Sequence, residues 1–275
     1  MECEAPRLRG FFFTFIKMNC SVICTLKRLA CNGSLALLVL AGAAAESAET
    51  TGSAITPFSA GSSGSAFPTP WRSVTLPKAK RPTQYTLVAD EATVVLRAQA
   101  NASMASLVHP LKVDPNHLSF ISWRWKISNL LSKADINTKS GDDFPARVYV
   151  LFDYDIGKLS LSQRIKIFLA RKLYAMEVPG AALCYVWDGK APVGTSAWSP
   201  YTDRVRVIVV ESGAANVGRW REAERDLVAD FRAAFGEEPP PISGVAVASD
   251  TDNTGESVTA MFGDIRLSAR RREGR

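Results

Sequence analysis

Residues 118–127 read LSFISWRWKI, and this stretch decides the expected fold. It is rich in aromatic and β-branched residues, which favour β-strands. Side chains alternate between the two faces of a strand, so one face, expected to be buried, carries Ile121, Trp123, Trp125 and Ile127. Residues 146–154, ARVYVLFDY, alternate in the same way. Both stretches therefore predict strands with one face in a hydrophobic core.

Further strand-like runs share this pattern, and turn residues separate them: residues 85–89, 93–98, 181–187, 205–210, 245–248 and 258–267. Many short strands with turn signals between them are typical of a β-sandwich or jelly roll, and not of a βαβ fold. The sequence therefore predicts a mainly β protein, a jelly-roll-like β-sandwich, formed by a single domain over residues 55–268.

Two amphipathic helices are expected to pack on this sandwich. Ser160 and Gln163 have the spacing of a capping box. Apolar residues then recur at helical intervals, namely Leu161, Ile165, Phe168, Leu169, Leu173 and Met176. The charged residues of this helix are all basic, so it either packs across one end of the sandwich or lies on an anionic membrane surface.

The second helix is predicted over residues 217–235, with Trp220 and Phe231 on its apolar face. Gly236 is well placed as its C-cap, and the three prolines at 239–241 prevent its continuation. We expect this helix to cover an edge or an end of a sheet.

The amino terminus has the pattern of an export signal. Residues 35–45, LALLVLAGAAA, are too short to span a bilayer comfortably, and they follow the basic pair Lys27 and Arg28. Ala43 and Ala45 supply a small-residue cleavage pattern. We expect a signal peptide over residues 1–45, with Met18 as an alternative start. The other interpretation of this segment is an uncleaved anchor.

Loss of this leader changes the composition of the chain. The whole sequence has a net charge of +6, but the leader holds five basic and two acidic residues, which leaves 28 basic and 25 acidic residues and a net charge of +3. Cys184 is then the one cysteine of five that remains, so no internal disulfide or thiol-based metal site can form. We expect an exported, periplasmic protein without a transmembrane span and without a nucleic-acid partner.

The segments that flank the predicted domain are polar. Residues 46–54 are expected to form a flexible lead-in, and residues 269–275 a basic, disordered tail.

Aromatic and arginine residues mark a candidate ligand-binding face. If the central strands are neighbours, alternation could place five such side chains on one sheet face: Arg124, Arg147, Tyr149, Tyr185 and Trp187. Aromatic rings stack on the apolar faces of sugars, and arginine donates paired hydrogen bonds to hydroxyls or carboxylates. This composition is typical of a carbohydrate-binding face. The alternative is that the tryptophan and tyrosine rings fill the core.

Acidic residues suggest two other kinds of site. Asp142 and Asp143, with Asp153, are candidate catalytic carboxylates of a glycosidase-like pair. Residues 250–256, DTDNTGE, resemble the start of a calcium loop, with Asp250, Asp252 and Asn253 as candidate ligands of a structural calcium ion. The alternative is an ordinary hairpin turn. No other cofactor is indicated.

Three stretches carry a resemblance to a known family: WRWK at residues 123–126, GDDFPARVYV at residues 141–150 and DTDNTG at residues 250–255. They resemble the bacterial exported-protein family catalogued as domain of unknown function 3047. This resemblance implies one domain of sandwich type and no particular activity. The ending over residues 258–267 also looks like the last strand of galactose-binding-like jelly rolls.

These observations favour an exported ligand-binding module, for carbohydrate or a cell-envelope glycan, over an enzyme. Two alternatives stay open. One is a glycan-active hydrolase or lyase that uses Asp142 or Asp143. The other is a non-catalytic envelope scaffold that contacts the membrane through its basic helix.

Overall fold

A computed structural model describes residues 54–75, 81–174 and 180–269. These residues lie in one compact unit of the chain, Thr50–Arg275. The predicted signal peptide, most of the predicted lead-in and residues 270–275 of the predicted tail lie outside the described residues.

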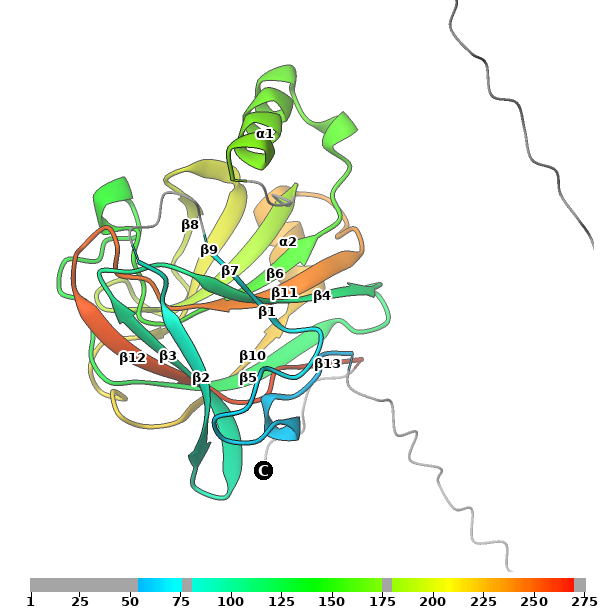
Figure 1. Cartoon of the computed structure of the whole chain (residues 1–275). Helices are drawn as coiled ribbons and strands as arrows, with labels where there is room; N and C mark the ends of the chain where they lie inside the picture. The colour runs from blue at the N-terminus through cyan, green and yellow to red at the C-terminus, as the bar shows by residue number, and fades with distance from the viewer. Residues whose placement is uncertain (1–53, 76–80, 175–179, 270–275) are drawn as a thin grey trace, which may run out of the picture. The chain divides into compact units, whose positions relative to one another are not determined.

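The strands form two sheets that face each other (Figure 1). The larger sheet has seven strands in the order β1 (Arg72–Val74), β4 (Ser106–Val113), β11 (Ile242–Ala248), β6 (Arg147–Phe152), β7 (Ala181–Asp188), β9 (Thr202–Ser212) and β8 (Ser196–Ser199). The smaller sheet has the order β10 (Arg221–Asp226), β5 (Phe120–Ile127), β12 (Ser257–Phe262), β3 (Thr93–Asn101) and β2 (Gln84–Asp90), and β13 (Arg266–Ser268) also pairs with β5. The described pairs are antiparallel except β7 with β9. This arrangement confirms the predicted jelly-roll-like sandwich.

The core between the sheets is built from large aromatic side chains. The ring centroids of Trp123 on β5 and Tyr185 on β7 lie 5.3 Å apart, and those of Trp125 and Trp187 lie 6.1 Å apart. All four rings are buried. The predicted inward face of residues 118–127 is confirmed, because Ile121, Trp123, Trp125 and Ile127 are buried while Arg124 points to the other side.

The segment before β1 belongs to this core. Ile55 and Phe58 are fully buried, and the indole Nε1 of Trp71 donates a hydrogen bond to the carbonyl of Thr56 at 2.7 Å. Ser59 bonds the carboxylate of Asp264, through its backbone N at 3.0 Å and its hydroxyl at 2.6 Å. Hydrogen bonds thus connect the segment before β1 to the segment between β12 and β13.

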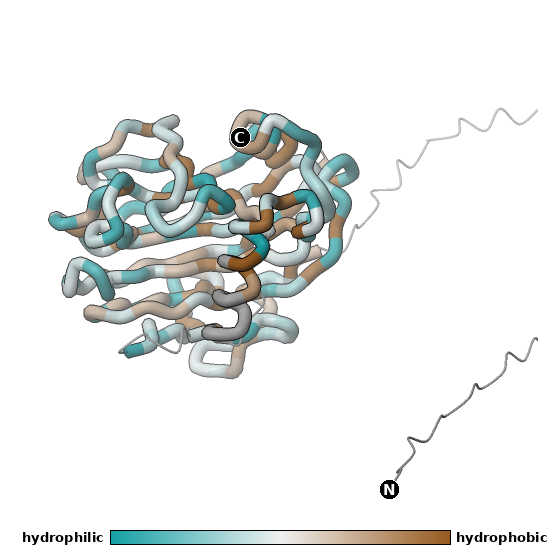
Figure 2. Tube along the Cα trace, turned by 90° about the horizontal axis from the view of Figure 1, so that it is seen from above, coloured by the Kyte–Doolittle hydropathy of each residue, from teal (hydrophilic) through white to brown (hydrophobic). Residues whose placement is uncertain are grey.

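Helix α1 (Leu161–Tyr174) begins at the predicted capping box. Ser160 N donates to Gln163 Oε1 at 3.0 Å, and Gln163 N donates to Ser160 Oγ at 3.3 Å. Leu161, Ile165 and Phe168 are exposed, whereas Ile167 is buried. In Figure 2, apolar and polar residues are mixed along this helix. No helix among the described residues is long and apolar enough to cross a membrane.

The prediction of a second helix over residues 217–235 is wrong over its first half. Residues 221–226 form β10, which pairs with β5 in the register Glu222 with Arg124, and α2 covers only Leu227–Phe235. The side chain of Asp226 accepts a hydrogen bond from Ala229 N at 3.0 Å and so caps α2 there. The backbone N–H and C=O groups before this cap form their hydrogen bonds with β5. The helix therefore begins only at Leu227.

Gly236 ends α2 as predicted. Its φ of 72° lies in the left-handed region, and its N–H donates to the Arg232 carbonyl at 2.8 Å. We expect Gly236→Ala to lower the free energy of unfolding by about 1–2 kcal/mol, because a Cβ disfavours this conformation. Urea unfolding measures the loss. Gly236→Asn should lose less, since asparagine tolerates the left-handed region, and equal losses would contradict this account.

The strands predicted over residues 85–89, 93–98, 181–187, 205–210 and 245–248 all lie within observed strands, namely β2, β3, β7, β9 and β11. The predicted strand 258–267 is two strands, β12 and β13, separated by Gly263, Asp264 and Ile265. The sequence reading missed β1, β4 and β8. The strand β4 contains Pro110, which argues against a strand when only the sequence is read.

Candidate functional site

The structure does not bring the five predicted ligand-binding residues to one face, so that expectation is wrong. Tyr185 and Trp187 are fully buried between the two sheets. Arg147 and Tyr149 lie on the outer face of the larger sheet, the face turned away from the smaller sheet. Arg124 lies on the outer face of the smaller sheet, where its guanidinium stacks on Trp220. The tyrosine and tryptophan of β7 therefore fill the core.

The error arises at β7, which is buried on both faces. Arg147 pairs with Val186, and Tyr149 pairs with Cys184, so the small apolar residues of β7 share the outer face with them. Alternation alone cannot show which of two buried faces is the interior of the sandwich. Burial also raises the pKa of the Cys184 thiol to about 12, so this thiol stays protonated at neutral pH.

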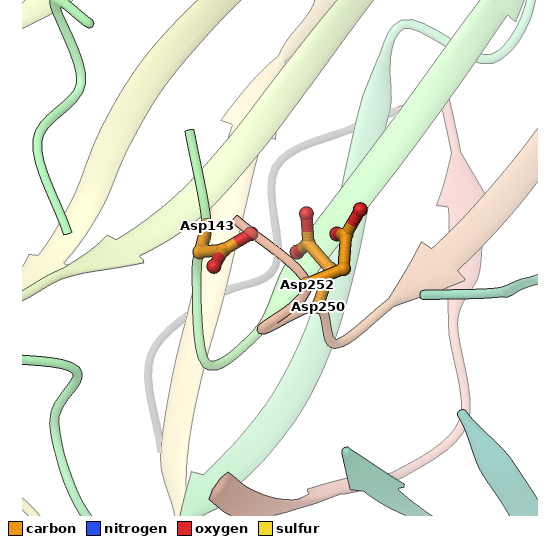
Figure 3. A group of neighbouring side chains, drawn as sticks. All are labelled: Asp143, Asp250 and Asp252. Carbon is orange, nitrogen blue, oxygen red and sulfur yellow. The ribbon is translucent and has the colours of Figure 1, made fainter. Parts of the chain in front are cut away.

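Five charged residues meet at the start of β6, and we call them the charged cluster: Asp142, Asp143, Arg147, Asp250 and Asp252. Asp142 and Asp143 lie in the loop that leads into β6, directly after a short 3₁₀ helix, Lys139–Gly141. Asp250 and Asp252 belong to the loop between β11 and β12. The pairing of β11 with β6, with Ala248 opposite Arg147, brings the two loops together. Figure 3 shows the carboxylates of Asp143, Asp250 and Asp252 converging.

Arg147 is the centre of the charged cluster. Its Nε donates to Asp250 Oδ1 at 2.7 Å, and its Nη2 donates to Asp250 Oδ2, which gives a two-pronged ion pair. Nη1 donates to Asp142 Oδ1 at 3.2 Å and to the hydroxyl of Tyr149 at 3.2 Å. The ring of Phe144 lies 4.5 Å from the guanidinium carbon. All donors of this buried arginine face fixed partners.

The buried Asp143 carboxylate holds the loop between β11 and β12 in place. It accepts hydrogen bonds from Thr254 N at 2.7 Å and from Asn253 Nδ2 at 3.1 Å. Asn253 Nδ2 also donates to the Asp142 carbonyl at 3.2 Å. The two stretches GDDF and DTDNTG therefore form one hydrogen-bonded unit.

Acidic groups outnumber basic groups in the charged cluster, and this excess of negative charge shifts the pKa values of its members. Burial raises the pKa of Asp250 to about 7, even though Arg147 opposes this, and the neighbouring Asp143 adds to the rise. Partial burial and Asp143 also raise the pKa of Asp252. Burial alone would lower the pKa of Arg147, but Asp250 holds it well above its ordinary value. The guanidinium is therefore always charged, and Asp250 titrates near neutral pH.

The carboxylates also bear on the predicted calcium site. Oxygens of Asp143, Asp250 and Asp252 lie within 4.8 Å of one another, and such oxygen ligands suit Ca²⁺. However, Arg147 binds both oxygens of Asp250, and Asn253 directs its Nδ2 to Asp143. The residues fit a calcium ion only in part, so calcium binding at Asp250, Asp252 and Asn253 stays a prediction.

Asp153 cannot act with Asp142 or Asp143 as a catalytic pair. It is exposed just beyond the far end of β6, so the six-residue strand separates it from them by about 20 Å. Carboxylate pairs in glycosidases lie about 5–9.5 Å apart.

Tyr201 forms an exposed rim beside the charged cluster, and the sequence analysis missed it. Its side chain is 57% exposed, and its hydroxyl lies 3.3 Å from Asn253 Oδ1 and 3.1 Å from the Lys139 carbonyl. Asp252 and Asn253 are exposed next to it. Tyr201 lies in the turn between β8 and β9. The sequence signal that could have identified it is an aromatic residue within the turn SPYTD at residues 199–203.

These features define a jelly-roll-like β-sandwich with a mostly buried charged cluster and an aromatic rim on the outer side of one sheet. The chain belongs to the family described as protein of unknown function DUF3047, whose model matches residues 69–266. No curated protein matches the sequence.

Several solved structures are similar to the chain at low identity. A family 11 carbohydrate-binding module from Clostridium thermocellum, in complex with a β-1,3-1,4-mixed-linked tetrasaccharide, is 10% identical with a TM-score of 0.36, over 76% of this chain and 95% of that module. A family 30 carbohydrate-binding module of a Clostridium thermocellum cellulase is 11% identical with a TM-score of 0.35, over 79% and 95%. The endo-1,4-β-glucanase CelB2 is 11% identical with a TM-score of 0.37, over 72% and 99%. Likenesses this weak assign no ligand to this chain.

Proposed function

We propose that this protein is an exported, periplasmic ligand-binding module for carbohydrate, specifically a cell-envelope glycan. The observation that carries the proposal is the exposed ring of Tyr201 beside Asn253, which is fixed by hydrogen bonds to the charged cluster. An aromatic ring packs against the C–H face of a sugar, while fixed acceptors and donors bind its hydroxyls. Asp252 and Asn253 supply acceptor oxygens at the surface, while the Nδ2 group of Asn253 donates to Asp142 and Asp143.

The geometry supports binding because the polar groups are rigid. Asn253 is held by Asp143 and Asp142, and these are held by Arg147 and the backbone of the loop. A rigid site loses little conformational freedom when a ligand binds, so more of the contact energy appears as affinity.

Tyr201→Ala is expected to weaken glycan binding about tenfold, because it removes the one stacking surface of the proposed site. A glycan array with the wild-type domain selects the ligand, and affinity electrophoresis or calorimetry then compares variants. Trp198→Ala is the matched control, because it removes another exposed ring of the β8 region, one that packs on Phe235 instead. An array without bound glycans, or equal binding by Tyr201→Ala and wild type, would reject the proposal.

A glycan-active hydrolase or lyase is a second candidate, favoured by the raised pKa of Asp250 beside Asp142 and Asp143. A general acid works best with a pKa near the operating pH. Binding ranks first because Asp143 and Asp250 are buried with their oxygens already bonded. Release of reducing sugar from the array-selected glycan, abolished by Asp142→Asn, would instead establish the enzyme. The envelope-scaffold alternative stays a prediction.

A further inference from the structure

A polar pocket lies on the outer face of the smaller sheet, whereas Tyr201 lies between β8 and β9 of the larger sheet. Its volume is about 330 Å³, and the residues that line it include Thr93, Ser122, Arg124, Glu222, Asp264 and Arg266. This volume matches the lower end of the range for small-molecule sites, about 300–1,000 Å³. Two guanidinium groups therefore border a pocket that can hold one small polar ligand.

Arg124 is clamped in a fixed position in this pocket. Its guanidinium carbon lies 4.4 Å from the ring centroid of Trp220. Its aliphatic stem rests on Gly263, where an added Cβ would come within 2.5 Å of Arg124 Cγ. Only glycine leaves room for the stem at this position. The arginine is thus held between an aromatic ring and a bare backbone.

The Trp220 ring is itself anchored. Its Nε1 donates to Asp90 Oδ2 at 2.7 Å, and Lys126 Nζ donates to the same carboxylate at 3.1 Å while lying 4.9 Å from the ring centroid. Hydrogen bonds from Lys126 and Trp220 outweigh the effect of burial and lower the pKa of Asp90, so this carboxylate stays charged. Arg124 therefore has its position before any ligand arrives.

The charges around the pocket leave Arg124 available. The Asp264 carboxylate already accepts two hydrogen bonds from Ser59, and Arg266 Nη2 lies 3.8 Å from it. Within residues 54–75, 81–174 and 180–269, Arg124 has no carboxylate oxygen within salt-bridge distance. Glu222 stands opposite Arg124 in the strand register. The described residues that line the pocket thus include two arginines, Arg124 and Arg266, and two acidic residues, Glu222 and Asp264.

We propose that this pocket binds a uronic acid, with the ligand carboxylate on Arg124 and Arg266 and the ligand hydroxyls on Thr93 and Ser122. The planar fork of arginine matches a carboxylate in two parallel hydrogen bonds, and the polar wall of the pocket suits a sugar ring. The acidic wall residues disfavour a compact, doubly charged anion such as phosphate. This site is separate from the Tyr201 site and does not depend on it.

Calorimetric titration of the wild-type domain with sodium glucuronate tests the proposal, with glucose and inorganic phosphate as comparison ligands. Glucuronate should bind at least about tenfold more tightly than either, and Arg124→Gln should weaken it about tenfold or more, the value of a charge-assisted hydrogen bond. Gly263→Ala should also weaken binding, because it displaces Arg124 without changing any charge. The indole N–H resonance of Trp220 should shift on titration.

Arg97→Gln is the matched control, since Arg97 lies on the same outer face and bonds Thr86 outside the pocket. It should bind glucuronate like wild type, as should Tyr201→Ala, which separates this test from that of the proposed glycan site. Melting temperatures confirm that each variant is folded. The proposal is overturned if glucuronate does not bind at millimolar concentration, if phosphate or glucose binds as tightly, or if Arg124→Gln matches Arg97→Gln.

Discussion

Replacement of Arg147 by methionine is expected to lower the free energy of unfolding by about 3–5 kcal/mol. The variant keeps the apolar stem but leaves Asp250 and Asp142 buried without their cation. Each carboxyl group must then either stay charged without hydration or take up a proton and lose its charge-assisted hydrogen bonds, and both outcomes destabilise the fold. Arg147→Lys should recover only part of the loss, because an ammonium group cannot bind Asp250 with two parallel hydrogen bonds.

Urea unfolding at pH 7 measures this loss, and Arg232→Met supplies the control. Arg232 pairs with Glu238, but both side chains are more than half exposed, so this pair is hydrated and contributes little. Losses of similar size in the two variants would show that the charged cluster does not stabilise the fold.

The second large effect is a fall in stability with rising pH. The pKa of Asp250 is about 7 in the folded protein and about 3.9 in an unfolded chain. The folded state therefore holds the proton more tightly, and this stabilisation is complete below about pH 4 and lost as the pH rises through 7. A shift of this size corresponds to about 4 kcal/mol in total, and roughly 3 kcal/mol of it should be lost between pH 5 and pH 8.

Melting temperatures between pH 5 and pH 8 test this expectation, with Asp250→Asn as the decisive variant. Asparagine does not titrate, so the variant should be less stable than wild type at pH 5 and should show a much flatter pH dependence. Asp153→Asn removes an exposed carboxylate and should keep the wild-type slope. A wild-type stability that rises over this window, or an unchanged slope in Asp250→Asn, would refute the assignment.

The sequence predicted those parts of the fold in which one face of an element is buried. Residues 118–127 alternate between large apolar and polar side chains, and the structure buries the expected face. The capping box at Ser160 also depends on neighbours in the chain alone. The helix predicted from residue 217 failed because its charged residues also fit a strand, and only the partner strand β5 decides between the two.

The sequence predicted the separate motifs of the candidate site, but it did not predict which motifs lie together in the fold. GDDF and DTDNTG were both recognised as acidic motifs, but their union depends on the pairing of β6 with β11. Likewise, Arg124 and Arg147 both proved to lie on outer faces, but on different sheets. Long-range pairing has no local signal in a single sequence, which is why one predicted face became two separate sites.

The bond between Ser59 and Asp264 joins residues that are 205 positions apart. Ile55 and Phe58 beside Ser59 belong to the same core as Phe262 and Ile265 beside Asp264. Contacts of such long sequence separation form slowly, because a large loop must close first. The sandwich can therefore close only after Asp264 has been synthesised, and until then Ser59 lacks this partner.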